Sequence, residues 1–323
     1  PDWLLVSSED LNHALLTEAA RVAPGRVIYV AHTPQFFPFG PASWHPDETA
    51  MHAVRSAAAV IVISQAMAEY VERHIGVRAT VIHPPMYGEG PHLPLGDFEH
   101  GFIAMINPCQ VKGISLFLAI ADAMRRQRFA ALPGWGTTHD DLANLKRRPN
   151  VTVLSRVREI EQFLSRVKIL LMPSLWLEGF GLIATEAMLR GVPVVASDSG
   201  GLKEAKAGTN YLIPVRLIEH YEPVFDDRYM PRPVLPAESI EPWVEAITEL
   251  SSDESRYRQE AASQKAAAEA FVARLDLLQI ERFLATLTPR EQAAHLPDEI
   301  QIGLSEAKQR LLLARLKHKQ VKS

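Results

Sequence analysis

The chain has 323 residues, of which 47% are hydrophobic and 22% charged, and its formal net charge is −4. This composition is typical of a globular protein of about two domains, excludes an intrinsically disordered chain, and argues against a dedicated nucleic-acid-binding protein, which needs clustered Lys and Arg. The single cysteine, Cys109, excludes a disulfide within the chain, which fits a reducing compartment. The sequence contains no apolar run of about 18 residues that would predict a membrane span. We therefore expect a cytoplasmic protein.

Short apolar runs alternate with helix-length segments along most of the chain. The runs are often β-branched and bounded by Pro, Gly, Asn or Ser, which is typical of strands buried on both faces of a parallel sheet. The expected helices between them include Ile114–Arg126, Ile160–Val167 and Thr185–Arg190. This alternation predicts doubly wound α/β units. The expected strands are Leu4–Val6, Val27–Val30, Val60–Ile63, Thr80–Ile82, Phe102–Ile106, Phe129–Leu132, Val151–Leu154, Ile169–Met172, Val194–Ala196 and Tyr211–Pro214.

A segment dense in Pro and Gly, Pro84–Gly96, predicts a boundary between two domains. The front domain, residues 1–96, holds only four expected strands, whereas residues 97–275 hold six. We therefore expect the front domain to be incomplete, with a further segment upstream of the chain. An exposed edge strand there would also favour self-association.

The last third of the chain reads as mostly helical. We expect Arg216–Ser239, which has four prolines, to be an irregular surface loop, followed by helices over Ile240–Leu250 and Arg256–Leu287. Residues 276–323 would add C-terminal helices and a basic tail. A final helix, Leu304–Leu316, is similar to linkers that precede modules of nonribosomal peptide and polyketide synthases, which makes such modules candidate partners. A plain surface helix is the alternative.

A glycine-containing turn follows the expected strand Ile169–Met172 and opens a helix. Gly179 and Gly181 allow close approach of a ligand to the backbone. Free N–H groups at the helix start, around Phe180–Leu182, form an anion site that suits a diphosphate. Two acids, Glu178 and Glu186, flank it. A carboxylate beside an anion site can accept hydrogen bonds from vicinal hydroxyls, so these acids point to a sugar and a ribose.

This segment resembles the signature of the retaining nucleotide-sugar glycosyltransferases of family 4, which have the GT-B fold of two Rossmann-like domains. The signature is a Glu, seven residues and a second Glu, and here the run continues through Gly191–Glu204. The resemblance covers residues 1–285 and lacks the first part of the family's N-terminal domain. It implies that Glu178 contacts the transferred sugar and Glu186 the ribose.

Other site residues are implied by the same resemblance. Lys112 matches a lysine that binds the donor diphosphate, while Asn107 stands near the place of its partner arginine. Gly134 belongs to a turn beneath the nucleotide, and Arg156 follows the strand whose backbone reads the base. His32, at the end of a front strand, would face the donor sugar. The donor-binding set is Asn107, Lys112, Gly134, Arg156, Glu178, Gly179, Phe180, Gly181, Leu182 and Glu186, and the expected catalytic residues are His32, Lys112 and Glu178.

The predicted reaction is retaining transfer of a hexose from a nucleotide-diphosphate sugar to an acceptor. Lys112, the helix N–H groups and Asn107 would stabilise the leaving diphosphate, so we expect neither a metal nor a cofactor. The acceptor is unknown, with a natural product or a glycolipid as candidates. Four aromatic residues after His32 either wall the acceptor site or form an ordinary aromatic loop: Phe36, Phe37, Phe39 and Trp44.

Two other functions fit parts of the sequence. A non-catalytic nucleotide-sugar-binding module within a larger assembly would suit the incomplete front domain and the replaced arginine. The intact glutamate pair and His32 argue against it. A sugar epimerase of the same fold is disfavoured by the spacing of the two glutamates. Cys109 is expected to be a packing thiol, because no motif places a base beside it.

Overall fold

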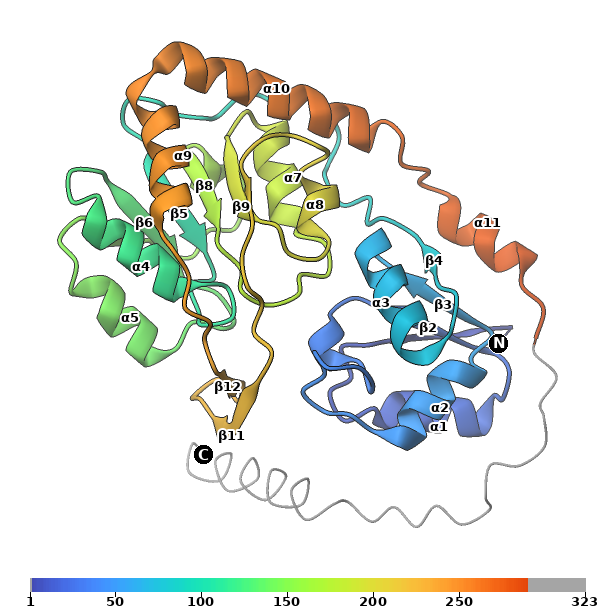
Figure 1. The fold of residues 1–323 in the computed structure, drawn as a ribbon. Helices are drawn as coiled ribbons and strands as arrows, with labels where there is room; N and C mark the ends of the chain where they lie inside the picture. Colours follow the sequence, from blue (N-terminus) through green and yellow to red (C-terminus); the bar gives the residue numbers. More distant parts are fainter. Residues whose placement is uncertain (1, 290–323) are drawn as a thin grey trace. The chain divides into compact units, whose positions relative to one another are not determined.

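The computed structural model describes residues 2–289, which contain two parallel β-sheets and the helices that cover them (Figure 1). The smaller sheet has the order β1-β2-β3-β4 and every neighbouring pair is parallel. Its strands and helices are β1 (Leu4–Ser7), α1 (Ala14–Val22), β2 (Val27–Ala31), the 3₁₀ turn η1 (Pro34–Phe36), α2 (Glu48–Ser56), β3 (Ala59–Val62), α3 (Gln65–Ile75) and β4 (Thr80–Val81).

The larger sheet has six parallel strands in the order β10-β9-β8-β5-β6-β7. Its elements are β5 (Phe102–Ile106), α4 (Ile114–Ala123), β6 (Phe129–Leu132), α5 (His139–Lys146), β7 (Val151–Val153), α6 (Glu161–Leu164), β8 (Val167–Met172), α7 (Leu182–Leu189), β9 (Val194–Ser197), α8 (Leu202–Ala205) and β10 (Leu212–Ile213). The chain then forms β11 (Tyr221–Phe225), β12 (Pro231–Pro233), α9 (Glu241–Ser252), α10 (Glu254–Val272) and α11 (Gln279–Thr286).

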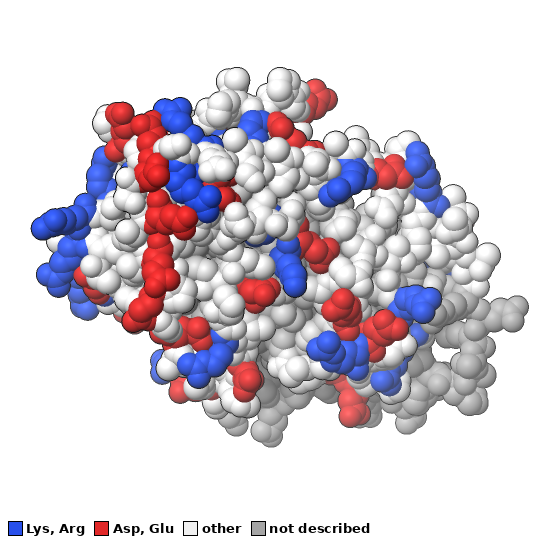
Figure 2. Space-filling view, turned by 45° about the horizontal axis from the view of Figure 1, so that its top comes forward, with Lys and Arg blue, Asp and Glu red and all other residues white. Residues whose placement is uncertain are grey.

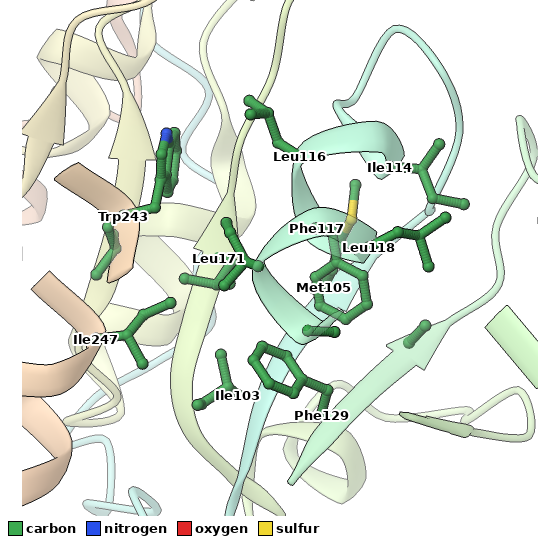
Figure 3. Close-up of a cluster of buried hydrophobic side chains, with 14 of the residues drawn as sticks. Ile103, Met105, Ile114, Leu116, Phe117, Leu118, Phe129, Leu171, Trp243 and Ile247 are labelled. Atoms are coloured by element: carbon green, nitrogen blue, oxygen red, sulfur yellow. The ribbon is translucent and has the colours of Figure 1, made fainter. Parts of the chain in front are cut away.

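Both faces of the larger sheet are buried, as the continuous apolar runs predicted. Side chains alternate between faces along a strand, so Ile103 and Met105 of β5 belong to one cluster and Phe102 and Ala104 to the other. Helices α4, α5 and α9 cover the first face, and Figure 3 shows Phe117 packed there. Helices α6, α7 and α8 contribute buried side chains to the second face.

Helix α9 shows how sequence pattern produces this packing. It buries Trp243 and Ile247 against the sheet, while Glu241, Glu245 and Glu249, spaced four residues apart, are exposed. That periodicity is the signature of a helix with one apolar face. The face drawn in Figure 2 shows one line of acidic side chains. Elsewhere on that face, acidic and basic side chains are interspersed.

All ten expected strands are present, and the predicted α/β class with parallel sheets is confirmed. Three helix or loop predictions were wrong. The expected helix Ile160–Val167 ends at Leu164, because Val167 is buried as the first residue of β8 and pairs with Phe102. The expected helix Arg256–Leu287 is broken between α10 and α11, where the Asp276 carboxylate accepts a hydrogen bond from the Leu278 N–H.

The segment Arg216–Ser239 was expected to be irregular but contains the antiparallel hairpin β11–β12. Its strands include Pro223, Pro231 and Pro233, and proline in a strand normally argues against one. A two-stranded ribbon has two outer edges, so a proline can sit where no ladder hydrogen bond is required. The expected helix Leu304–Leu316 and the basic tail lie outside the described residues. Within residues 2–289, no helix is long and apolar enough to cross a membrane.

Candidate active site

The strand order of the larger sheet makes a topological switch point at the carboxyl ends of β5 and β8, where open α/β sheets form a crevice. From β5 the chain proceeds to β6 and β7 on one side, whereas β8 leads to β9 and β10 on the other. The loops after β5 and β8 therefore diverge, and open α/β sheets bind ligands at such a switch point. Lys112 lies in the first loop and Glu178 in the second.

Lys112 and Glu178 meet across this crevice. Lys112 Nζ donates a hydrogen bond of 2.6 Å to Glu178 Oε1, and the Ser174 hydroxyl donates to the same oxygen. Lys112 Nζ also lies 4.3 Å from the centre of the Trp176 ring. Glu178 is only 5% exposed, and a buried carboxylate needs such partners. The structure thus brings together Lys112, which the sequence resemblance assigned to the diphosphate, and Glu178, which it assigned to the sugar.

The turn after Glu178 brings backbone close to the smaller sheet. A Cβ at Gly179 would clash with the carbonyl oxygen of His32, so only glycine allows this approach. Gly181 caps α7 with a φ of +97°, a conformation that L side chains rarely adopt. The first N–H groups of α7, starting at Leu182, lie at this end and have no acceptor within the helix.

His32 follows β2 at the carboxyl edge of the smaller sheet. Its Nδ1 lies 3.3 Å from Ser7 Oγ, and its backbone N–H donates to Ser8 Oγ at 2.9 Å. Burial lowers the pKa of His32, because removal from water disfavours the imidazolium. The neutral ring is therefore favoured at pH 7, and its backbone lies against the turn that carries Glu178 and Gly179.

Asn107 supports the neighbouring turn instead of simply replacing the family's arginine. Its backbone has a φ of +52°, and its Oδ1 accepts a hydrogen bond of 2.8 Å from the Gly136 N–H. A Cβ at Gly134 would lie 2.6 Å from that oxygen, so glycine is needed there. The Asn107 Nδ2 is buried without a hydrogen-bond partner among the described residues. It is a donor that a ligand oxygen could satisfy.

Three other predicted residues have different surroundings. Phe180 is 2% exposed and its ring stacks on Phe271 with 5.8 Å between centroids, so its side chain packs in the core. Glu186 lies on α7, where burial raises its pKa although Arg190 acts in the opposite direction. Arg156 is exposed after β7. Among the contacts of residues 2–289, none joins Glu186 or Arg156 to the Lys112–Glu178 pair.

The aromatic residues after His32 divide into two groups. Phe37 and Phe39 are buried in the core of the smaller sheet, so they are packing residues. Trp44 instead packs against Trp176, with ring centroids 6.1 Å apart. Sequence reasoning missed Trp176, although it lies two residues before Glu178 and next to the turn.

Two further observations concern reactive groups. Cys109 is fully buried, and burial raises the pKa of its thiol to about 12, which keeps it protonated and supports a packing role. In the part of the chain that the structure describes, no group of three or more His, Cys, Asp or Glu side chains is arranged to hold a metal ion.

Comparisons with known proteins agree with this fold. Residues 98–221 match the family model described as Glycosyl transferases group 1. No curated protein matches the chain in sequence. Among solved structures, HepE from Anabaena in complex with UDP and glucose is 19% identical with a TM-score of 0.61, covering 88% of this chain and 78% of its own.

Two other solved structures are similar at the level of the fold. Sucrose-phosphate synthase from Thermosynechococcus elongatus is 19% identical, with a TM-score of 0.56 and coverage of 80% of this chain and 68% of its own. The pneumococcal O-GlcNAc transferase GtfA in complex with UDP and GlcNAc is 18% identical, with a TM-score of 0.57 and coverage of 87% and 56%. Residues 98–221 therefore resemble a group 1 glycosyltransferase domain, and the chain has a GT-B-like α/β fold, in agreement with the resemblance found in the sequence.

Proposed function

We propose that this chain transfers a hexose from a nucleoside-diphosphate sugar to an acceptor with retention of anomeric configuration. The observation that carries the proposal is the meeting of Lys112 and Glu178 at the crevice between β5 and β8, beside the N-terminus of α7. A cation, helix N–H groups and a carboxylate at one switch point suit a diphosphate joined to a sugar. HepE, which has a similar fold, has been solved with UDP-glucose.

The two ends of the donor would use different groups. Lys112 Nζ and the N–H groups of α7 would stabilise the negative charge that develops on the departing diphosphate. Within residues 2–289, the hydrogen bonds that the Glu178 carboxylate accepts from Lys112 and Ser174 both end at Oε1. Oε2 can therefore accept from a hydroxyl of the donor sugar. Glu186 is proposed to bind the ribose, and His32 to support transfer near the sugar.

Calorimetric titration with UDP and UDP-glucose tests these roles. Glu178→Gln should leave UDP affinity unchanged or higher, because Lys112 loses a competing anion, and should lower the affinity for UDP-glucose. Glu186→Gln should weaken both ligands. A charge-assisted hydrogen bond contributes about 1.5–3 kcal/mol, equivalent to about a 10- to 150-fold loss. Glu159→Gln, an exposed control in the segment between β7 and α6, should change neither. Equal losses for both ligands in both variants would refute the assignment.

We also propose that transfer needs no metal ion, because Lys112 and the α7 amides supply the positive charge that a divalent cation would otherwise bring to the diphosphate. Hydrolysis of UDP-glucose by the full chain should then continue at the same rate in excess EDTA. The rate is followed by release of UDP. Loss of turnover in EDTA that Mn²⁺ restores would contradict this part of the proposal.

A further inference from the structure

The β11–β12 hairpin exposes large apolar side chains close together. Val224 is 45% exposed, Phe225 42%, Tyr229 45% and Val234 51%. They lie within eleven consecutive residues: Val224 and Phe225 on β11, Tyr229 in the turn, and Val234 directly after β12. Apolar side chains scattered singly over a surface need no explanation, but a cluster indicates a surface that binds something. We call these four residues the hairpin face, meaning the exposed apolar side chains of the hairpin and not one side of its two strands.

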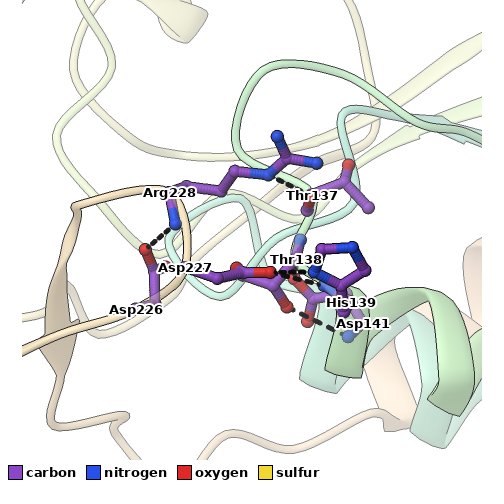
Figure 4. A network of polar contacts seen from close by, with 7 residues as sticks. All are labelled: Thr137, Thr138, His139, Asp141, Asp226, Asp227 and Arg228. Carbon is purple, nitrogen blue, oxygen red and sulfur yellow. Dashed lines mark hydrogen bonds and ion pairs between the residues drawn. The ribbon is translucent and has the colours of Figure 1, made fainter. Parts of the chain in front are cut away.

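The turn of the hairpin is held to the body of the larger sheet by polar contacts (Figure 4). Arg228 Nε donates to the Thr137 carbonyl at 2.8 Å. The Asp227 carboxylate accepts a hydrogen bond of 3.1 Å from the His139 N–H and pairs with the His139 imidazole. Asp226 accepts from the Arg228 N–H at 2.8 Å. Since Thr137 directly follows the Gly134–Gly136 turn, the hairpin is fixed beside the predicted donor site.

A chain of aromatic contacts connects the hairpin to Lys112. The ring of Tyr221, the first residue of β11, lies 5.7 Å from that of Trp44, which contacts Trp176 at 6.1 Å. Trp176 in turn contacts Trp135 at 6.0 Å and carries Lys112 Nζ over its ring. Trp135 is 52% exposed. Trp176 is only 4% exposed, so these rings pack the hairpin against the residues that would bind the donor, with Trp135 as exposed aromatic surface beside them.

The charges on the hairpin are largely paired. Arg232 lies 3.5 Å from Glu222, one on each strand, and Asp227 pairs with His139. The charged side chains of the hairpin have no positive excess, because Glu222, Asp226 and Asp227 outnumber Arg228 and Arg232. An anionic bilayer is recognised by clusters of Lys and Arg, so this surface better fits the apolar part of a single uncharged molecule.

We propose that the hairpin face binds an apolar group of the acceptor, such as an alkyl chain or an aromatic aglycone, and holds its hydroxyl toward the Lys112–Glu178 crevice. This inference rests on the proposed function, since it names the class of acceptor for that same site. The side chains that select it are Val224 and Phe225, with Trp135 lining the path to the donor.

Alkyl glucosides of increasing chain length, used below their micellar concentrations, test this proposal on the full chain saturated with UDP. Calorimetry or tryptophan fluorescence should show tighter binding of octyl than of methyl glucoside, with up to about a fourfold gain per fully buried methylene. The double variant Val224→Ser, Phe225→Ser should lose this dependence on chain length. The matched control is Leu277→Ser, because Leu277 is an apolar residue that is 70% exposed between α10 and α11. This control variant should keep the dependence on chain length.

UDP affinity, measured on the same samples, distinguishes failure of acceptor binding at the hairpin from failure of donor binding. UDP binding that is unchanged in the double variant, together with a lost chain-length dependence, supports the hairpin face. UDP binding without any effect of chain length in the unaltered chain overturns this inference but leaves the proposed function standing. Absence of UDP binding overturns the proposed function itself. The chain could instead bind phosphatidylcholine vesicles through Val224 and Phe225 and show no preference among glucosides. That result would overturn acceptor binding and identify the hairpin face as a membrane-binding surface.

Discussion

Lys206 is a charged residue that the fold buries completely, at 0% exposure. Its Nζ donates to the Val194 carbonyl at 2.6 Å, and Gln264 from α10 bonds to the same strand residue. Burial lowers the pKa of Lys206 to about 7, although Glu260 nearby acts in the opposite direction. The hydrogen bond of Lys206 therefore joins β9 to the segment after α8, while burial favours the uncharged form of the lysine.

This shift makes a prediction for stability. Between pH 7 and 10.5 the unfolded chain keeps the lysine proton while the folded chain has lost it, so stability from this group rises with pH by up to about 1.4 kcal/mol per pH unit. Lys206→Met removes that dependence. Its stability relative to the unaltered chain, from urea unfolding, should therefore be highest near pH 6.5 and fall toward pH 9. The exposed neighbour variant Lys203→Met should show no such trend, and a flat difference for Lys206→Met would contradict the prediction.

At the residue scale, sequence could identify Lys112 and Glu178 as candidates but not as partners. Their types and positions after strands β5 and β8 point to a site. Their pairing depends on which side-chain conformations the packed loops allow, and Trp176 and Ser174 set those conformations. The role of Asn107 in holding the Gly136 N–H was likewise invisible, because nothing local marks a hydrogen bond across 29 residues.

At the element scale, the short helix α8 contacts helix α3 of the smaller sheet through one side chain. Glu204 Oε1 accepts a hydrogen bond of 3.1 Å from the Ala66 N–H in the first turn of α3. Its Oε2 lies 2.9 Å from His83 Nε2, in the segment that follows β4. A carboxylate at a helix N-terminus is favoured by the helix dipole as well as by the free N–H groups.

This contact predicts a stability change below pH 4.5. Burial would raise the pKa of Glu204, but hydrogen bonds from His83 and from the Gln65 and Ala66 N–H groups outweigh it, and the net shift is downward. The stabilisation is therefore present above the unfolded value of 4.5 and is lost as pH falls through the lower folded pKa. Glu204→Gln should lower the free energy of unfolding by about 1.5–3 kcal/mol at pH 7.

Denaturant unfolding between pH 3 and 7 checks this expectation. The difference between the unaltered chain and Glu204→Gln should be constant down to pH 5 and shrink below it. Glu69→Gln, an exposed change on the same helix α3, should have little effect at any pH. A Glu204→Gln difference independent of pH down to 3 would show that the carboxylate's charge has no part in this contact.

Elements differed in how well the sequence predicted them. Buried parallel strands such as β5 and β6 were predicted to the residue, because short apolar runs bounded by turn residues occur at each of them. The hairpin β11–β12 was missed because its strands carry prolines and expose their apolar side chains, so neither alternation nor burial marks them. It is held by tertiary contacts with the start of α5.

At the scale of the molecule, the order of the larger sheet decides where the site lies. Strand periodicity predicts that strands exist but not that β5 neighbours β8. That neighbour relation places the Lys112 and Glu178 loops together. The division into residues 1–96, 97–275 and 276–323 stays a prediction, as does self-association. The smaller sheet does have β1 at one edge, with Leu5 48% exposed.

The anomer that forms first shows whether this crevice transfers sugar with retention. Proton NMR of UDP-glucose with the full chain should show α-glucose appearing before its mutarotation, with water as acceptor, or an α-linked product when an alkyl glucoside is added. Lys112→Ala, with its fold verified by circular dichroism, should slow this appearance about 100-fold, as expected for loss of a charge that stabilises the leaving group. Initial formation of β-glucose would contradict retention, and α-glucose formed equally fast without Lys112 would contradict the role of this lysine.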